Sequence, residues 1–285
     1  MKIGIDSYCY HRYMGDVYDH QEQPSENWTV ERFVNRAKEL QVDGVSLESC
    51  FFPRFDKDDL SEIRGLLDEA GIDRVWAWGH PDGLEGGKNE AEFDKMLEHL
   101  EYAKIMGTDV MRVVASSLMF RHEPHHEQIE RLSRMFEKAV KSAEQYGIKM
   151  AIENHIDFNS DEIQQILDNV GSPYLGVNFD TGNFIRVLDD PVKAAKKLGK
   201  YVLATHIKDV KPLESVPADT WYFFSSVPVG QGLVDVKGVA TALKDAGYEG
   251  CLALEIDSLH PDYANDEDQV VEDSIRQLRV LAGDI

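Results

Sequence analysis

A short pattern recurs along this chain, in which an amphipathic stretch ends at a glycine and an apolar run follows at once. It is visible in EAGIDRVWAW, IMGTDVMRVV, QYGIKMAIEN, KLGKYVLATH and DAGYEGCLAL, and in ELQVDGVSLE with Gln41 in place of the glycine. A glycine just after a helix supplies the left-handed conformation that closes the helix before the chain turns back. The pattern predicts helix ends at Gly71, Gly107, Gly147, Gly171, Gly199 and Gly247.

The apolar runs predict strands that begin near residues 2, 43, 73, 109, 148, 174, 201 and 250, with a mean step of about 35 residues. That step has room for one strand, one helix and two short loops. Apolar residues recur at helical spacing between the strands, as in Leu60, Ile63 and Leu67. Asp190-Pro191 is a typical cap and first residue of a sixth helix.

Eight such units with no antiparallel signal predict an α/β fold, the (β/α)₈ or TIM barrel. An open doubly wound sheet is the rival, but no Gly-x-Gly-x-x-Gly follows the first strand. No linker or low-complexity tract divides the sequence, so we expect a single domain over residues 1–285.

Composition excludes several classes of partner. The net charge of −22, from 52 acidic and 30 basic residues, repels phosphate backbones and anionic membranes, so nucleic acid is not expected. No apolar run approaches the roughly 18 residues that span a bilayer, and MKIGIDSYCYH is typical of a first strand rather than a signal peptide. Three widely spaced cysteines fit a reducing compartment. We expect a cytoplasmic protein with a small-molecule substrate, and leave open a homo-oligomer or a partner subunit.

Four apolar runs in the second half each end in a residue type that binds metal ions. They are MAIENH with Glu153, LGVNFD with Asp180, VLATHIKD with His206 and CLALEID with Glu255. Active sites of (β/α)₈ barrels lie at the C-terminal ends of the strands, where these side chains would meet. A polar residue at one strand end is often only solvated, but four in register are not. Three carboxylates and one imidazole suit a divalent cation, which we expect to be Mn²⁺, with Mg²⁺, Co²⁺ or Zn²⁺ as alternatives.

Other polar and aromatic residues at the same strand ends are candidates for substrate binding. Trp76 and Trp78 alternate along one strand, so only one can face the site, and both sugar stacking and barrel packing stay open. Lys208 alternates with His206, and either orients a substrate oxygen or pairs with a neighbouring carboxylate. The two longest loops, residues 8–28 and 209–234, are expected to form lids or substrate walls. The substrate-binding candidates are His11, Glu48, Trp78, His80, Asn183 and Lys208.

Glu-Asn-His, Asp-Thr-Gly-Asn, His-Ile-Lys-Asp and Leu-Glu-Ile-Asp at strands five to eight resemble the motifs of the xylose isomerase-like barrel superfamily. The nearest resemblance is to its sugar phosphate isomerase/epimerase group, which includes the ketose 3-epimerases, and it extends through PVGQGLVDVKGVATALKDAGYEGCLALEID. It implies that the four residues named above are metal ligands, and that Glu153 and Glu255 also transfer the proton. The chain departs from the group in two respects. Asn183 stands where relatives often carry histidine, and the substrate-binding arginine after the strand-seven histidine has no obvious counterpart, since Lys208 and Lys211 are the only nearby cations.

These residue types predict proton transfer next to a polarised carbonyl. A divalent cation acidifies the neighbouring C–H and stabilises an enediolate, and carboxylates on opposite faces invert the carbon. We therefore expect a metal-dependent isomerase or epimerase of a small ketose or keto-sugar. The alternative is a lyase or dehydratase of the same barrel, acting on a 3-keto-glycoside, as C-glycoside deglycosidases do, or on a 3-dehydroshikimate-like acid, with His155 as acid/base. A non-catalytic sugar-binding or partner subunit would be expected to lack a ligand, and none is lost.

Overall fold

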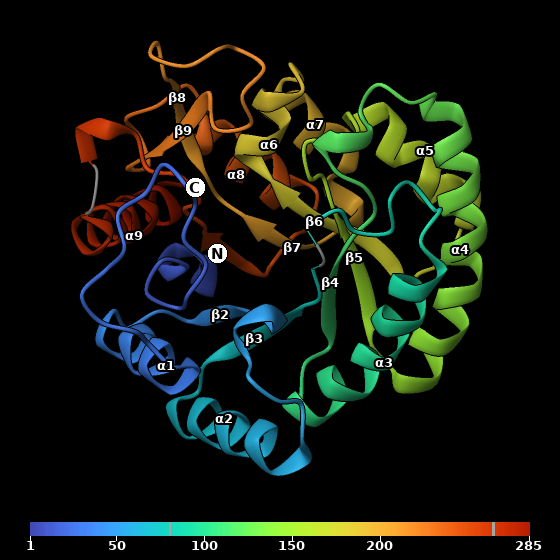
Figure 1. Ribbon diagram of the computed structural model, residues 1–285, viewed down its shortest axis with the longest axis horizontal. Coiled ribbons are helices and arrows are strands. Elements are labelled where there is room, and N and C mark those ends of the chain that lie inside the picture. Colours follow the sequence, from blue (N-terminus) through green and yellow to red (C-terminus); the bar gives the residue numbers. More distant parts are fainter. Residues whose placement is uncertain (80, 264–265) are drawn as a thin grey trace.

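The computed structural model describes residues 1–79, 81–263 and 266–285, whose central feature is a barrel of eight parallel strands surrounded by helices (Figure 1). The order around the barrel is β10-β1-β2-β3-β4-β5-β6-β7. It closes where Ile207 N–H donates to Ala253 O (2.7 Å) and Glu255 N–H donates to Ile207 O (3.1 Å). The strands are β1 (Lys2–Asp6), β2 (Gly44–Glu48), β3 (Asp73–Ala77), β4 (Val110–Val114), β5 (Lys149–Glu153), β6 (Leu175–Asp180), β7 (Val202–His206) and β10 (Cys251–Leu254). The predicted barrel is confirmed, and each predicted strand start lies within one residue of the observed one.

Helices form the outer layer, and the apolar stripe of each faces the strands. In α2, for example, Leu60, Ile63 and Leu67 are buried, as their spacing predicted. The predicted helix start at Asp190-Pro191 is confirmed, because the Asp190 side chain accepts from the backbone of α7 and Pro191 opens it. The helices are α1 (Val30–Glu39), α2 (Lys57–Ala70), α3 (Glu90–Met106), α4 (His125–Tyr146), α5 (Ser160–Val170), α6 (Thr181–Arg186), α7 (Pro191–Leu198), α8 (Val236–Asp245) and α9 (Glu267–Asp284).

The glycines at helix ends behave as expected with one exception. Gly71, Gly107, Gly147 and Gly171 have φ between 60° and 71°, and Gln41 takes the same left-handed conformation. At Gly199 the predicted helix end is confirmed, because α7 ends at Leu198, but the expected left-handed conformation is wrong, since the φ of Gly199 is −49° and the chain continues into a 3₁₀ turn. A Cβ at this position would lie 2.6 Å from that of Ala246, so the glycine allows close packing rather than a left-handed cap.

The loop after β7 contains an antiparallel hairpin, which corrects the expectation of no antiparallel pairing. Its strands β8 (Asp209–Pro212) and β9 (Phe224–Val227) have four residues each, too few for a visible alternation. The loop after β1 begins with the 3₁₀ helix η1 (Ser7–Tyr10). It contacts the loop that contains the β8–β9 hairpin through two pairs of aromatic rings. Tyr18 and Trp221 lie 4.8 Å apart between centroids, and His20 and Tyr222 lie 3.9 Å apart. The two longest loops therefore form one continuous wall.

Trp76 belongs to the packing between barrel and helices. Its ring is 1% exposed, lies 4.9 Å from the Phe52 ring, and donates from Nε1 to Nδ1 of His99 in α3 (3.2 Å). Of the two alternatives for Trp76, barrel packing is the observed one. In the described parts of the chain, no helix has both the length and the apolar character that crossing a membrane requires.

Candidate metal centre and active site

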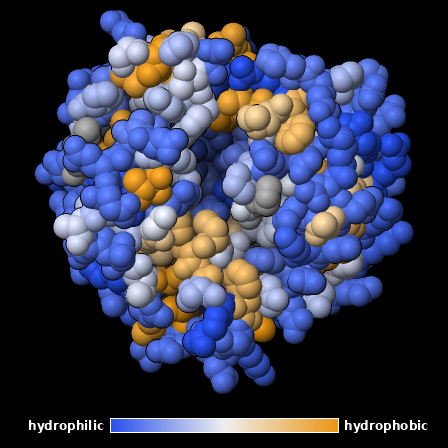
Figure 2. All heavy atoms as spheres, in the orientation of Figure 1, coloured by the Kyte–Doolittle hydropathy of each residue, from blue (hydrophilic) through white to orange (hydrophobic). Residues whose placement is uncertain are grey.

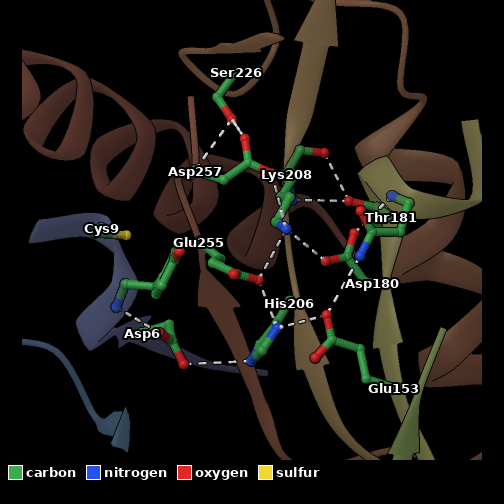
Figure 3. A network of polar contacts seen from close by, with 12 residues as sticks. Asp6, Cys9, Glu153, Asp180, Thr181, His206, Lys208, Ser226, Glu255 and Asp257 are labelled. Carbon is green, nitrogen blue, oxygen red and sulfur yellow. Dashed lines mark hydrogen bonds and ion pairs between the residues drawn. The ribbon is translucent and has the colours of Figure 1, made fainter. Parts of the chain in front are cut away.

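Four strand ends bring three carboxylates and one imidazole to a single point inside the barrel (Figure 3). Ligand atoms of Glu153, Asp180, His206 and Glu255 all lie within 4.8 Å of one another. Strand register explains this convergence, because Asp180 lies opposite His206, and the residues just before Glu255 pair with the end of β7. The four residues singled out in the sequence are thus brought together by the fold.

The cluster fits a divalent cation on the evidence of its unsatisfied atoms. All four side chains are buried, and among the described residues Asp180 Oδ2, His206 Nδ1 and Glu255 Oε2 have ion-pair neighbours but no hydrogen-bond partner. Burying charged atoms without hydrogen bonds is costly, and a bound cation would offset that cost. Carboxylate oxygens and an imidazole nitrogen are ligands for Mn²⁺, Mg²⁺, Co²⁺ and Zn²⁺ alike. The cluster is therefore a buried Glu/Asp/His set of the kind that holds a divalent metal.

The pKa values of the three carboxyl groups in the cluster are set by burial and by the neighbouring charges. Burial raises the pKa of Asp180 to about 7. Burial opposes ionisation of Glu255 as well, but the neighbouring His206 lowers its pKa to about 2. At Glu153 the effect of burial is outweighed by the charges of Arg112 and His206, which hold its pKa well below the usual range. Carboxylates packed this closely favour a bound cation, since each negative charge raises the cost of the next.

Lys208 faces the same side as His206, as its alternation predicted. Its Nζ lies 3.0 Å from Asp180 Oδ2 and 3.2 Å from both Glu255 Oε2 and Asp257 Oδ2. The ammonium group therefore neutralises part of the cluster and also reaches the cavity above it.

His206 is held from below by a carboxylate that the sequence reading missed. Asp6 Oδ2 lies 3.4 Å from His206 Nε2, and Asp6 Oδ1 accepts a hydrogen bond from Tyr8 N–H (2.6 Å). A carboxylate behind a metal-binding imidazole selects the tautomer with the proton on the far nitrogen. Without a metal the imidazole is charged, because Glu255 and Glu153 raise its pKa well above the usual value in spite of burial, and its Nδ1 lies 2.5 Å from Glu255 Oε2. A bound metal ion would replace the Nδ1 proton and leave the Nε2 proton facing Asp6. The available signal was that β1, like the later strands, is an apolar run ending in an acidic residue.

Arg112 is a second functional residue that the sequence reading missed. It lies within the apolar strand β4, and its Nη2 donates to Glu48 Oε1 (2.8 Å) while Nε lies 2.6 Å from Glu153 Oε2. Gly79 leaves space for it, because a Cβ there would lie 2.3 Å from Arg112 Nη1. Burial raises the pKa of Glu48 to about 8 in spite of Arg112. A lone charge in a buried strand was the signal, since it is stable only when paired.

A cavity of about 620 Å³ opens above the cluster. Of the substrate-binding candidates, Glu48, Asn183 and Lys208 line it. Asn183 donates to Glu153 Oε1 (3.3 Å), and its own Oδ1 accepts from Arg186 Nη1 (2.9 Å). Asn183 is thus placed to orient one of the two glutamates.

The other three candidates differ in their placement. His11 lies with its ring nitrogens 2.5 Å and 2.7 Å from the backbone oxygens of Asp16 and Asp257. Trp78 is 3% exposed, and among the described residues neither it nor His11 contributes to the cavity lining. His80 lies outside the described residues.

His155 lines the cavity and has a free ring nitrogen. It is buried, its Nδ1 makes no hydrogen bond, and burial lowers its pKa so that the neutral imidazole is favoured. The turn that carries it is strained, since Ile156 has a φ of 59°, unusual for a β-branched residue. Asp157 Oδ1 holds this turn by accepting from the backbone N–H of His155 (2.9 Å) and Phe158 (2.7 Å).

An arginine does reach the cavity, although not from the position after the β7 histidine. Arg186 in α6 lines it, and its Nη1 lies 2.7 Å from Asp257 Oδ2. Asp257 lies two residues beyond Glu255, after the end of β10, and also lines the cavity. The expected position for this arginine was shortly after the β7 histidine. Arg186 lies instead at the end of the short helix α6, between β6 and α7, so counting residues from that histidine could not find it.

A family model for the xylose isomerase-like TIM barrel matches residues 34–281. The chain belongs to that family. The resemblance found in the strand-end motifs is thereby confirmed, and the buried cluster occupies the strand ends at which barrel active sites lie.

Individual relatives of this xylose isomerase-like barrel catalyse different reactions. The 3-oxo-isoapionate decarboxylase of Pectobacterium atrosepticum is 25% identical over 154 residues, 53% of each chain. The inosose dehydratase of Lacticaseibacillus casei is 22% identical over 190 residues, 59% of this chain and 63% of the relative. The matched part therefore spans about half to two thirds of these relatives' length. A crystal structure of D-psicose 3-epimerase in the presence of D-fructose shares the fold, with a TM-score of 0.75, 16% identity and 98% of each chain covered.

Proposed function

We propose that this protein is a divalent-metal-dependent isomerase or epimerase that acts on a small ketose or keto-sugar. The observation that carries the proposal is the pair of glutamates, Glu153 and Glu255, that belong to one buried cluster beneath a cavity. A divalent cation, for which we propose Mn²⁺, would act there as a Lewis acid that polarises a carbonyl and acidifies the adjacent C–H.

The two glutamates supply the proton transfer. One carboxylate takes the proton from the carbon next to the carbonyl and becomes a carboxylic acid, and the electron pair of the C–H bond moves toward the carbonyl oxygen. The other glutamate relays a proton from solvent to the opposite face, so the carbon is inverted, and the first glutamate then returns its proton to solvent. Arg112 and Asn183 hold the Glu153 carboxylate, which keeps it aimed and ionised. Lys208, at the cavity floor, is placed to donate to a substrate oxygen.

Solvent exchange tests this proposal directly. The metal-loaded protein is incubated in D₂O with a panel of ketoses and 3-keto-glycosides, and deuterium in the sugar is measured by mass spectrometry. Glu153→Gln and Glu255→Gln should each remove nearly all exchange, while Glu130→Gln, an exposed control on α4, should not. Wild-type exchange in either site variant, with metal retained by elemental analysis, would make that residue a ligand only.

Metal occupancy is tested separately. Asp180→Ala and His206→Ala should lower the Mn²⁺ content well below the wild-type value after dialysis against a limiting metal buffer. Full stoichiometric metal in both variants would refute the site.

Elimination is a second candidate, and His155 favours it. The residue lines the cavity and its Nδ1 makes no hydrogen bond to the described residues, so the ring could protonate a leaving group after the C–H proton is removed. The matched dehydratase and decarboxylase are consistent with such variety. If the reaction is epimerisation, His155→Asn should lower kcat by about 10- to 100-fold. Under elimination it should abolish turnover while C–H exchange and metal binding persist, and release of water or an aglycone without any epimer would establish this reaction.

The wider expectations remain part of the proposal. A small carbohydrate rather than nucleic acid or a membrane is supported by the net charge of −22. A cytoplasmic location is supported by three cysteines that are all free thiols. All four ligand residues are present, which argues against a non-catalytic subunit.

A further inference from the structure

A second cavity lies at the end of the barrel opposite the metal cluster. The cavity above the cluster is the hydrophilic hollow at the centre of Figure 2. The second one, here called the lower cavity, has a volume of about 320 Å³ and is lined by the first residues of β2, β3, β4 and β10, among others. Large branched side chains usually fill the interior of a (β/α)₈ barrel in layers. The lower cavity therefore requires a local explanation.

The explanation is the small size of the side chains that point into this half of the barrel. Residues two apart on a strand share a face, and Glu48, Asp180 and His206 all point to the barrel interior. The residues two positions earlier on the same strands therefore point there too. They are Ser46, Asn178 and Ala204. All three line the lower cavity, and none is larger than asparagine, so they leave space that branched side chains would fill.

Two side chains of the lower cavity have polar atoms without a partner. Asn178 is 0% exposed, and neither its Oδ1 nor its Nδ2 has a hydrogen-bond partner among the described residues. Ser46 is 2% exposed, and its Oγ is unpartnered in the same sense. The hydroxyls of Thr205 and Tyr248, which also line the cavity, differ in that both donate to the backbone oxygen of Cys251 (2.8 Å each). Burying an amide and a hydroxyl without partners is costly, and a ligand that bonds to both would offset that cost.

The charges of the lower cavity favour an uncharged ligand. Its unpartnered side chains, Asn178 and Ser46, are neutral. The charged residues of the lining lie at the strand starts, and two of them, Asp73 and Arg74, form ion pairs with residues outside it. An ion bound beside neutral groups would lose its hydration without gaining a counter-charge. The volume of about 320 Å³ is at the lower end of the roughly 300–1,000 Å³ that ligand cavities occupy, so the ligand is small.

We propose that the lower cavity binds a small neutral polyol, which hydrogen-bonds to Asn178 and Ser46. These two residues belong to β6 and β2, which lie opposite each other in the ring of eight strands, so they approach the cavity from opposite sides. A ligand that satisfies both must carry polar groups along its length. Each hydroxyl of a polyol both donates and accepts, as the amide and the serine hydroxyl together do. This site requires neither the metal nor the proposed reaction.

The thiol of Cys251 provides a readout that is specific to the lower cavity. It lines the cavity and is partly exposed, and burial raises its pKa to about 12, so it reacts slowly with iodoacetamide. Peptide mass spectrometry distinguishes its alkylation from that of Cys9 and Cys50. Glycerol, erythritol, xylitol and sorbitol are titrated in turn, and at least one should slow the alkylation of Cys251 in a saturable way that gives a Kd. The Kd of xylonate, the charged counterpart of xylitol, should be at least about tenfold higher than that of xylitol.

Variants test the two residues that carry the proposal. Asn178→Leu keeps the approximate size of the side chain but removes both polar atoms, and it should raise the Kd of the best polyol at least about tenfold. Ser46→Ala should raise that Kd at least about threefold. Asn35→Leu, the same exchange on an exposed residue of α1, is the matched control and should keep the wild-type Kd. Circular dichroism verifies folding, and if Asn178→Leu does not fold, Ser46→Ala decides.

Three results would overturn the proposal. If none of the four polyols protects Cys251, the lower cavity holds water only. If xylonate protects as well as xylitol, the site does not select a neutral ligand. If protection is unchanged in the folded variants of Asn178 and Ser46, the polyol acts without these residues. Because the readout is alkylation at the lower cavity, a failure of deuterium exchange would refute the proposed reaction and leave this site standing.

Discussion

The donors of the metal cluster are aimed by residues that the cluster itself does not contain. Asp6 lies behind His206, while Arg112 and Asn183 contact Glu153. Such partners restrict the rotamers of the ligands before a metal arrives, so less order has to be imposed when it binds.

At the scale of single residues, the first prediction concerns Asp6. Asp6→Asn can no longer provide a charged acceptor for the Nε2 proton of His206, so the tautomer with Nδ1 free becomes less favoured. We expect the Kd for Mn²⁺ to rise by about 10- to 100-fold. Competition with a fluorescent chelator measures it.

Asp262→Asn, on a 66%-exposed side chain, is the control, and circular dichroism verifies that both variants fold. An unchanged Kd in Asp6→Asn would show that Asp6 has no part in orienting the imidazole.

At the scale of elements, the contact between β3 and α3 has a pH dependence of its own. Burial lowers the pKa of His99 to about 4, and Trp76 Nε1 donates to its Nδ1, which must therefore be unprotonated. Unfolding exposes the imidazole, whose pKa returns to about 6.5. The stabilisation is present above pH 6.5 and is lost as the pH falls toward 4.

The second prediction follows from that sign. Replacing His99 with Gln should flatten the decline of unfolding free energy between pH 7 and pH 4.5, because the group that takes up the proton is gone. Urea unfolding at several pH values measures the slope, and each unit of pKa shift corresponds to about 1.4 kcal/mol. His122→Gln, on an exposed histidine, is the control. Equal slopes in wild type and His99→Gln would contradict the assignment.

The elements also show where sequence reading succeeds. Strand starts were predictable because strands buried on both faces are continuous apolar runs, and helix stripes because burial of one helix face imposes a period of 3.6 residues. The hairpin of β8 and β9 was not, since four-residue strands show no period. Arg112 was passed over because its strand is otherwise apolar, and the meeting of Tyr18 with Trp221 depends on loops far apart in the chain. The metal cluster was predictable because parallel strands end on one rim, but the residues that aim its ligands were not.

At the scale of the whole molecule, the two ends of the chain are fastened together. Arg12 in the loop after β1 pairs with Glu267 at the start of α9, with Nη2 donating to Oε2 at 2.9 Å. Tyr10 Oη donates to Asp268 Oδ1 (2.7 Å), and β1 pairs with β10. The loop that carries Tyr8 and Tyr18 to the cavity is thus anchored on the last helix.

The third prediction tests that anchor. Arg12→Met should leave the buried carboxylate of Glu267 without its partner, and we expect a loss of about 3–5 kcal/mol in the free energy of unfolding. Guanidinium titration measures it, and Arg134→Met on the exposed face of α4 serves as control. A loss below about 1 kcal/mol would show that the pair contributes no more than a surface ion pair.

The strand order also has a consequence for how the protein is made. During translation, Glu153 and Asp180 leave the ribosome well before Glu255. The strand that closes the barrel, β10, leaves it after all the other strands. A nascent chain thus presents an incomplete set of ligands to cellular metals. If the proposed metal binds here, full coordination becomes available only when β10 docks between β7 and β1, so metal loading would follow synthesis of all eight barrel strands and would report that the barrel has closed.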